Sequence, residues 1–174
     1  MKYIAILRGI NVGGKRKILM ADLKLLFSSL GFSQVVSYIQ SGNIVFHSEG
    51  NKNLSKIIEA EILKQYGFEV PLIVIDKNEF NNIIQGNPYK NKEEKQLYVS
   101  FFKASPNLEL VNLLSNQSFA PDQFKITEKA VYIFCNTKYS DSKLTNTFLE
   151  KKLKETITTR NWKSSLKISE LLNE

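Results

Sequence analysis

The stretch that decides the fold is residues 35–47, VVSYIQSGNIVFH, in which two short apolar runs flank a polar turn. Residues 35–39 and 44–47 are rich in the β-branched and aromatic residues that favour strands. The residues between them include the glycine and asparagine that tight turns favour. The stretch therefore predicts a β-hairpin, and two strands joined in this way are antiparallel.

Sequence patterns on both sides of the hairpin predict four more elements. Residues 3–7 and 70–75 are apolar runs of strand length. Between these strands and the hairpin, apolar residues recur at helical spacing over residues 23–30 and 54–66, and Gly31 and Gly67 follow as helix stops. The resulting order, βαββαβ, is that of a ferredoxin-like unit, an antiparallel sheet with two helices on one face.

The order of elements largely repeats in the second half. Asp76 and Glu79 predict a capped short helix that stops at Gly86, and the polar residues 87–95 predict a connection. The elements predicted beyond it are a strand at 97–102, a helix with Ser105 as N-cap, strands at 123–127 and 130–135, a helix over 144–153 and a last helix over 164–172. We therefore predict an α/β (α+β) protein with two ferredoxin-like βαββα(β) halves and antiparallel sheets. Its domains would be residues 1–86 and 96–174, joined by residues 87–95.

The composition is that of an ordinary globular protein with a basic surface. The 174 residues are 43% hydrophobic, and the formal net charge is +7. No apolar run approaches the length that spans a bilayer, and no signal-peptide pattern is present. We expect a cytoplasmic protein with no membrane partner. The single cysteine, Cys135, lies in an apolar run, which predicts a buried, unreactive thiol.

A glycine-rich basic loop follows the first predicted strand. Residues 9–16, GINVGGKR, have the spacing of a Walker A loop except at the last position, where Arg16 replaces the Ser or Thr that ligates magnesium. A P-loop enzyme also needs parallel crossovers, which the hairpin excludes, so we reject an NTPase. Two interpretations stay open: backbone amides with Arg8 and Lys15 attract an anion, or the glycines only turn the chain and Arg8 bonds to backbone carbonyls.

Two further segments could contribute to the same site. The hairpin turn offers hydroxyl and amide groups, although such side chains also bond their own backbone. Residues 158–162 contain an arginine and the only tryptophan, which could recognise an anion or instead dock the last helix on the core. If the three segments converge, the predicted ligand-binding residues are Arg8, Asn11, Gly13, Gly14, Lys15, Gln40, Ser41, Asn43, Arg160 and Asn161.

This set supplies positive charge and hydrogen-bond donors but no general base. Ser41 is its one candidate nucleophile, so the sequence assigns no catalytic residue and leaves open whether the protein is an enzyme. His47 has no partner at metal-ligand spacing, and we predict neither a metal site nor a cofactor.

Three functions are compatible with these features. The first is binding of a small phosphate- or carboxylate-bearing ligand in a cleft between the glycine-rich loop, the hairpin turn and the Arg160 segment. The second is binding of single-stranded nucleic acid, because ferredoxin-like sheets can stack bases on exposed aromatics such as Tyr98 or Tyr132. The third is a structural or interaction protein without a ligand.

The chain resembles the domain-of-unknown-function 1697 family (DUF1697), small bacterial proteins without an established activity. The segments that carry the resemblance are residues 3–15, 20–23, 30–32, 38–46, 87–89 and 159–162. The chain departs from the family pattern at Leu19, where proline is common, and at residues 163–165. The resemblance implies a paired ferredoxin-like α/β fold and brings no assigned catalytic residues.

Overall fold

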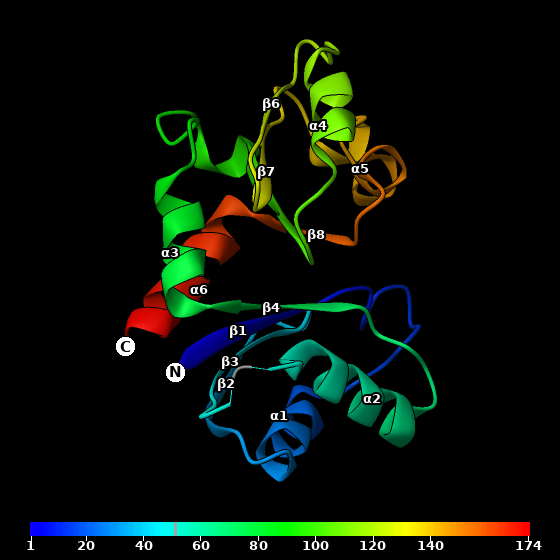
Figure 1. Ribbon diagram of the computed structural model, residues 1–174, viewed down its shortest axis with the longest axis vertical. Helices are drawn as coiled ribbons and strands as arrows, with labels where there is room; N and C mark the ends of the chain where they lie inside the picture. Colours follow the sequence, from blue (N-terminus) through cyan, green and yellow to red (C-terminus); the bar gives the residue numbers. More distant parts are fainter. Residues whose placement is uncertain (51) are drawn as a thin grey trace. The chain divides into compact units, whose positions relative to one another are not determined.

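A computed structural model of the chain describes residues 1–50 and 52–174. The chain divides into two compact units (Figure 1). The first consists of Met1–Asn81 with Ile168–Glu174, and the second of Asn82–Lys167. The domain limits expected from the sequence, at residues 86 and 96, stay a prediction.

The first unit is an antiparallel sheet with two helices on one face (Figure 1). Its elements are β1 (Lys2–Leu7), α1 (Met20–Ser29), β2 (Ser33–Tyr38), β3 (Asn43–His47), α2 (Leu54–Tyr66) and β4 (Leu72–Asp76). The strand order is β2-β3-β1-β4, and β1 pairs antiparallel with both β3 and β4. This is the ferredoxin-like arrangement that the hairpin and the element order predict.

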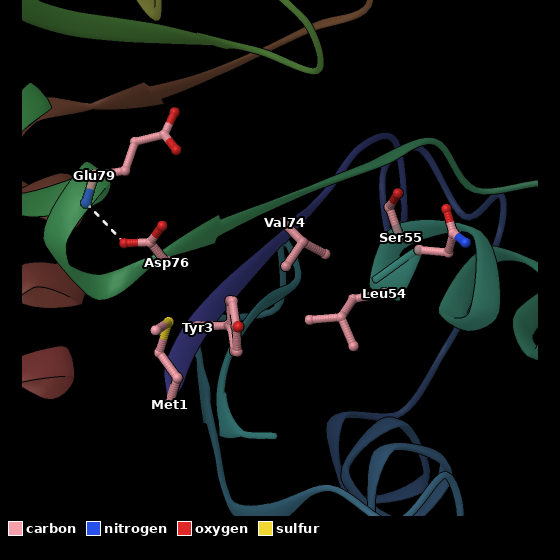
Figure 2. Close-up of a pocket in the computed structure, with 8 residues that line it drawn as sticks. Met1, Tyr3, Leu54, Ser55, Val74, Asp76 and Glu79 are labelled. Atoms are coloured by element: carbon pink, nitrogen blue, oxygen red, sulfur yellow. Dashed lines mark hydrogen bonds between the residues drawn. The ribbon is translucent and has the colours of Figure 1, made fainter. Parts of the chain in front are cut away.

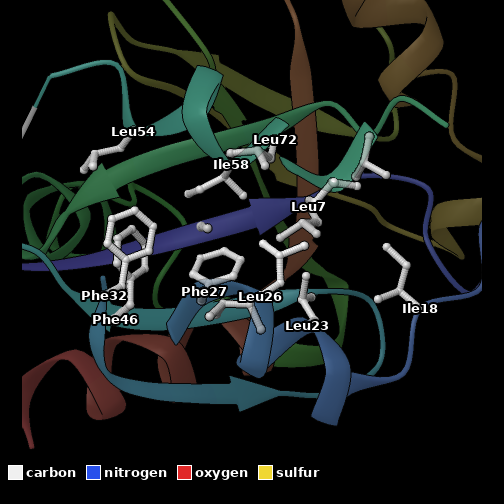
Figure 3. Close-up of a cluster of buried hydrophobic side chains, with 14 of the residues drawn as sticks. Leu7, Ile18, Leu23, Leu26, Phe27, Phe32, Phe46, Leu54, Ile58 and Leu72 are labelled. Carbon is white, nitrogen blue, oxygen red and sulfur yellow. The ribbon is translucent and has the colours of Figure 1, made fainter. Parts of the chain in front are cut away.

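The core of this unit lies between the sheet and the helices α1 and α2 (Figure 3). Alternate residues of β1, including Ala5 and Leu7, belong to this core. Phe46 of β3 makes an edge-on contact with Phe27 of α1, with ring centroids 5.3 Å apart. Fully burying a side chain of this size contributes about 1.5–3 kcal/mol. Because β1 is buried along its whole length from Tyr3 to Leu7, its sequence is a continuous apolar run rather than an alternating one.

Glycines stop two of the helices, and an aspartate caps the start of a third, as the sequence predicts. Gly31 and Gly67 adopt left-handed φ angles of +84° and +74° directly after α1 and α2. The next helix, α3 (Lys77–Gln85), begins after Asp76, whose Oδ1 accepts a hydrogen bond of 2.9 Å from the Glu79 amide.

The second unit repeats the strand order of the first. Its strands are β5 (Leu97–Phe102), β6 (Gln123–Ile126), β7 (Ala130–Phe134) and β8 (Ile157–Asn161), and its helices include α4 (Leu108–Ser115) and α5 (Asn146–Leu153). The remaining elements are the 3₁₀ turns η1 (Glu94–Gln96) and η2 (Tyr139–Asp141) and the last helix, α6 (Trp162–Asn173). The sheet order is β6-β7-β5-β8, again antiparallel throughout.

The same backbone contacts hold the central strand of each unit at its end. In the first unit the Leu7 amide donates to Gly42 O at 2.8 Å, and the Arg8 amide donates to Pro71 O at 3.0 Å. At the end of β5, the Phe102 amide donates to Lys129 O at 3.3 Å, and the Lys103 amide donates to Thr156 O at 3.0 Å. The loops that follow differ greatly, because residues 8–19 lead to α1 whereas residues 103–107 suffice to reach α4.

Two details of the second half differ from the sequence prediction. Residues 157–161 form strand β8, the last strand of a βαββα(β) half, for which the sequence analysis assigned no residues. This strand is rich in threonine, and the Thr159 hydroxyl lies 2.6 Å from Ser100 Oγ on β5. The N-cap of α4 is Asn107 rather than Ser105, because the Asn107 side chain accepts from the Glu109 amide at 2.8 Å.

The hairpin turn makes Gly42 the most constrained glycine of the first unit. Its φ is +84°, and a Cβ added there would lie 2.8 Å from Leu7 Cβ. Gly14 has a similar φ of +72° but open space around it. We expect Gly42→Ala to lower the free energy of unfolding by about 3 kcal/mol or more, and Gly14→Ala by about 1 kcal/mol. Urea unfolding followed by circular dichroism measures both. Equal losses would show that strain, and not the close approach to β1, decides the cost.

Burial of Cys135 predicts a pH-dependent stability. Burial in the core of the second unit raises the pKa of the Cys135 thiol from 9.0 to about 11. The unfolded chain therefore loses this proton first, and stability that is complete below pH 9 is lost as the pH rises to 11. Cys135→Ala should flatten the fall in unfolding free energy over this pH range, whatever its cost at pH 7. If parent and variant decline in parallel, the thiol does not cause the dependence.

Candidate functional site

The glycine-rich loop after β1 is a miniature hairpin. Val12 and Lys15 form an antiparallel bridge, and the Lys15 amide donates to Val12 O at 3.1 Å. Gly13 and Gly14, at the tip, have φ angles of +59° and +72°, as a type I′ turn requires at both central positions. No atom lies within 4 Å of a Cβ added to either glycine, so the tip is open to an approaching group.

Asn11 fixes this loop to the rest of the first unit. Its Oδ1 accepts from the Ile18 amide at 2.9 Å, and its Nδ2 donates to Ile18 O at 2.9 Å. The same Nδ2 also donates to Gln40 O at 2.9 Å in the β2–β3 turn. Asn11 adopts a φ of 56°, which asparagine tolerates better than most residues. One amide side chain thus joins the two loops that the sequence analysis singled out.

The ends of three strands meet beside these loops. Ile6 of β1 is paired with Asn43 of β3, and the Arg8 amide donates to Pro71 O just before β4. This antiparallel pairing brings Arg8 close to the hairpin turn, as the sequence predicts for neighbouring strands. Asn43 is completely buried, and its Nδ2 donates to Tyr38 O at 3.1 Å and to Ser41 Oγ at 3.2 Å.

The predicted site residues of this unit fall into two groups. Gly13, Gly14, Lys15 and Gln40 are exposed, and Arg8 and Ser41 are half-buried. Asn11 and Asn43 instead use their side-chain amides to hold the loops in place. Their side chains therefore position the residues around them.

Arg160 and Asn161 lie in the second unit, on β8. The Arg160 Nη1 donates to Thr159 O at 3.1 Å, and burial lowers the pKa of its guanidinium to about 10. Asn161 Oδ1 accepts from the Ser164 amide at 2.8 Å and so caps the first turn of α6. Trp162 is buried at the start of the same helix. That Arg160 and Asn161 share a ligand with the glycine-rich loop stays a prediction.

Positive charge gathers on the glycine-rich loop. Lys15, Arg16 and Lys17 are all exposed, and no carboxylate of residues 1–50 or 52–174 forms an ion pair with any of them. The guanidinium of Arg16 folds back over Gly9, where its Nη1 would lie 3.3 Å from an added Cβ. Exposed cations beside open backbone amides are a favourable environment for an anion.

A pocket of about 490 Å³ lies at the opposite end of β1 and was not predicted (Figure 2). It is formed by the starts of β1 and α2, the end of β4 and the first turn of α3. Its polar side chains are those of Tyr3, Asn53, Ser55, Asp76 and Glu79. Burial, with the charge of Asp76 as a smaller cause, raises the pKa of Tyr3. The sequence signal was present in the spacing of Asp76 and Glu79, which we interpreted only as a helix start.

The strand aromatics on which nucleic-acid binding would depend are largely used in packing. Phe46 belongs to the core of the first unit. The Tyr132 hydroxyl donates to Ile83 O at 2.7 Å, and Phe134 packs against Tyr89 with ring centroids 6.5 Å apart. Tyr98 stacks on Tyr139 at 4.5 Å, beside a pocket of about 440 Å³. The first three rings are thus not available to stack on bases.

The described residues contain neither a metal-type cluster of side chains nor a membrane-spanning helix. No group of three or more His, Cys, Asp or Glu side chains there is arranged to hold a metal ion. Among those residues, no helix has the length and apolar character needed to cross a membrane.

The strand order and the loop geometry define a paired ferredoxin-like α/β protein. A family model described as "Protein of unknown function (DUF1697)" matches residues 1–132, and the chain belongs to this family, as its motifs predict. No curated protein matches the chain. A solved structure, that of the conserved bacterial protein SP0830 from Streptococcus pneumoniae, is 23% identical with a TM-score of 0.79, and the match covers 98% of each chain. A likeness at this identity shows the fold alone.

The hydrogen bonds of Asn11 predict how the loop responds to mutation. Asn11→Ala removes all three side-chain bonds and should lower the free energy of unfolding by about 2–3 kcal/mol. The loop should also open, so trypsin should cleave after Lys15, Arg16 or Lys17 faster than in the parent. Asn11→Asp keeps the acceptor for the Ile18 amide and should give an intermediate rate. Unchanged cleavage in Asn11→Ala would show that the loop does not depend on this residue.

Proposed function

We propose that the protein binds a small anionic ligand, bearing phosphate or carboxylate groups, at the surface of the glycine-rich loop. The observation that carries the proposal is the Asn11 side chain, which holds the cationic loop against the turn at Gln40. The arrangement exists without a ligand, so binding costs little ordering of the backbone.

The chemistry of the surface favours an anion over other ligands. Lys15, Arg16 and Lys17 provide charge at the loop, and Arg8 adds a guanidinium at the end of β1. The open tip lets an oxyanion approach the amides of Gly13 and Gly14 without meeting a side chain. A guanidinium can bind two oxygens of one phosphate or carboxylate at once.

We assign binding to this surface and no catalytic residue. Donors and cations can orient and stabilise a negatively charged group, as a transfer reaction with a phosphorylated donor would need, but these residues supply no general base. The cytoplasm is the location we propose, in agreement with a single buried thiol.

Thermal unfolding with added anions tests the proposal. Pyrophosphate and succinate, each titrated at constant ionic strength, represent the two ligand classes. At saturation we expect one of them to raise the unfolding midpoint of the parent by about 5 °C. The double variant Lys15→Gln/Arg16→Gln should lose most of this shift.

A matched control separates a site from general salt effects. Lys24→Gln/Lys56→Gln removes the same charge from exposed positions on α1 and α2 and should keep the full shift. Equal shifts in both double variants would contradict the proposal and favour the ligand-free hypothesis. Arg160→Lys keeps the charge but loses the forked geometry, so a reduced shift in this variant would support its predicted role at the same ligand.

A further inference from the structure

The pocket at the start of β1, which the sequence did not predict, is lined by the hydroxyl-bearing side chain of Tyr3. Tyr3 is only 6% exposed, and its ring stacks on Phe46 with centroids 5.7 Å apart. Its hydroxyl makes no hydrogen bond with any residue of 1–50 or 52–174, although the side chain lines the pocket. The ring is buried, but the side chain borders the pocket, so its hydroxyl is available to a ligand there.

A carboxylate lines the same pocket as this hydroxyl. Asp76 on β4 is directly opposite Tyr3 in the antiparallel register, where facing side chains are neighbours. Its Oδ1 accepts from the Glu79 amide, and no described residue donates to its Oδ2. Glu79 contributes a second carboxylate to the lining (Figure 2). The raised pKa of Tyr3, caused in part by Asp76, agrees with this proximity.

The rest of the pocket includes apolar side chains and the chain's own N-terminus. Leu54 and Val74 line it between the polar groups (Figure 2). The ammonium of Met1, which also lines the pocket, donates to His47 Nε2 and to Ser48 O, each at 2.8 Å. The volume of about 490 Å³ is within the range of small-molecule sites.

We propose that this pocket binds a small organic amine as its ammonium ion. The ammonium group donates to Asp76 and to the Tyr3 hydroxyl, and the alkyl chain contacts Leu54 and Val74. An inorganic metal ion fits less well, because the described residues contain no cluster of three metal-ligating side chains. The site is independent of the anion surface, which lies at the other end of β1.

Calorimetric titration of the full chain with 1,4-diaminobutane tests this proposal. Asp76→Asn removes the charge but keeps a good helix N-cap, and it should weaken binding about tenfold or more. Tyr3→Phe removes only the hydroxyl and should weaken binding about threefold to tenfold. Because Tyr3→Phe deletes a single unbonded oxygen, it carries the test if Asp76→Asn fails to fold.

Two matched variants serve as controls. Glu61→Gln removes a negative charge of α2 that pairs with Lys64 and does not line the pocket. Tyr66→Phe removes another hydroxyl that lacks a hydrogen-bond partner, also away from the pocket. Both should bind the diamine as the parent does.

The following results would overturn the proposal. The first is that the parent does not bind the diamine detectably, and the second is that a control variant weakens binding as much as its matched pocket variant. The third is that neutral 1-butanol binds as tightly as butylamine. The fourth is that Mg²⁺ or Ca²⁺ binds more tightly at the same residues. Lys15→Gln/Arg16→Gln should leave diamine binding unchanged, so failure of either proposal is distinguishable from failure of the other.

Discussion

The antiparallel pairing of β1 with both β3 and β4 is the constraint on which the rest of the first unit depends. It buries β1 along its length and fixes which loops meet at each of its ends. At one end, Arg8 lies beside the hairpin turn and the start of β4. At the other, Tyr3 lies opposite Asp76. A shift of one residue in this register would turn the core side chains away from α1 and α2 and would separate both sets of polar groups.

The register also separates charges of opposite sign within one small sheet. Cations are concentrated on the loop that follows β1, whereas the carboxylates Asp76 and Glu79 lie near its beginning. The central strand spans six residues, which corresponds to about 20 Å of extended chain. At physiological ionic strength this exceeds the screening distance of about 8 Å, so the charges at the two ends influence each other little.

The elements that the sequence predicted are those with strong local signals. The hairpin, the apolar run of β1 and the glycine stops at Gly31 and Gly67 all depend on neighbouring residues, and the structure contains each of them. Strand β8 could not be recognised in this way, because its residues become a strand by pairing with β5 and by the contact of Thr159 with Ser100. The hydrogen bonds of Asn11 and the unbonded hydroxyl of Tyr3 could not be predicted for the same reason. One depends on a carbonyl at Gln40, and the other on the absence of a hydrogen-bond partner within the described chain.

The matching backbone contacts at the ends of β1 and β5 allow the loops that follow these strands to differ in sequence and length. In both units the last residues of the central strand are held by main-chain bonds that any residue except proline can make. The sheet can therefore form whatever loop follows the central strand. A long glycine-rich loop follows one copy and a five-residue connection, residues 103–107, follows the other, with the same strand order beneath each. The repeated framework therefore provides two attachment points of equal geometry, one of which carries a long loop while the other keeps a short connection.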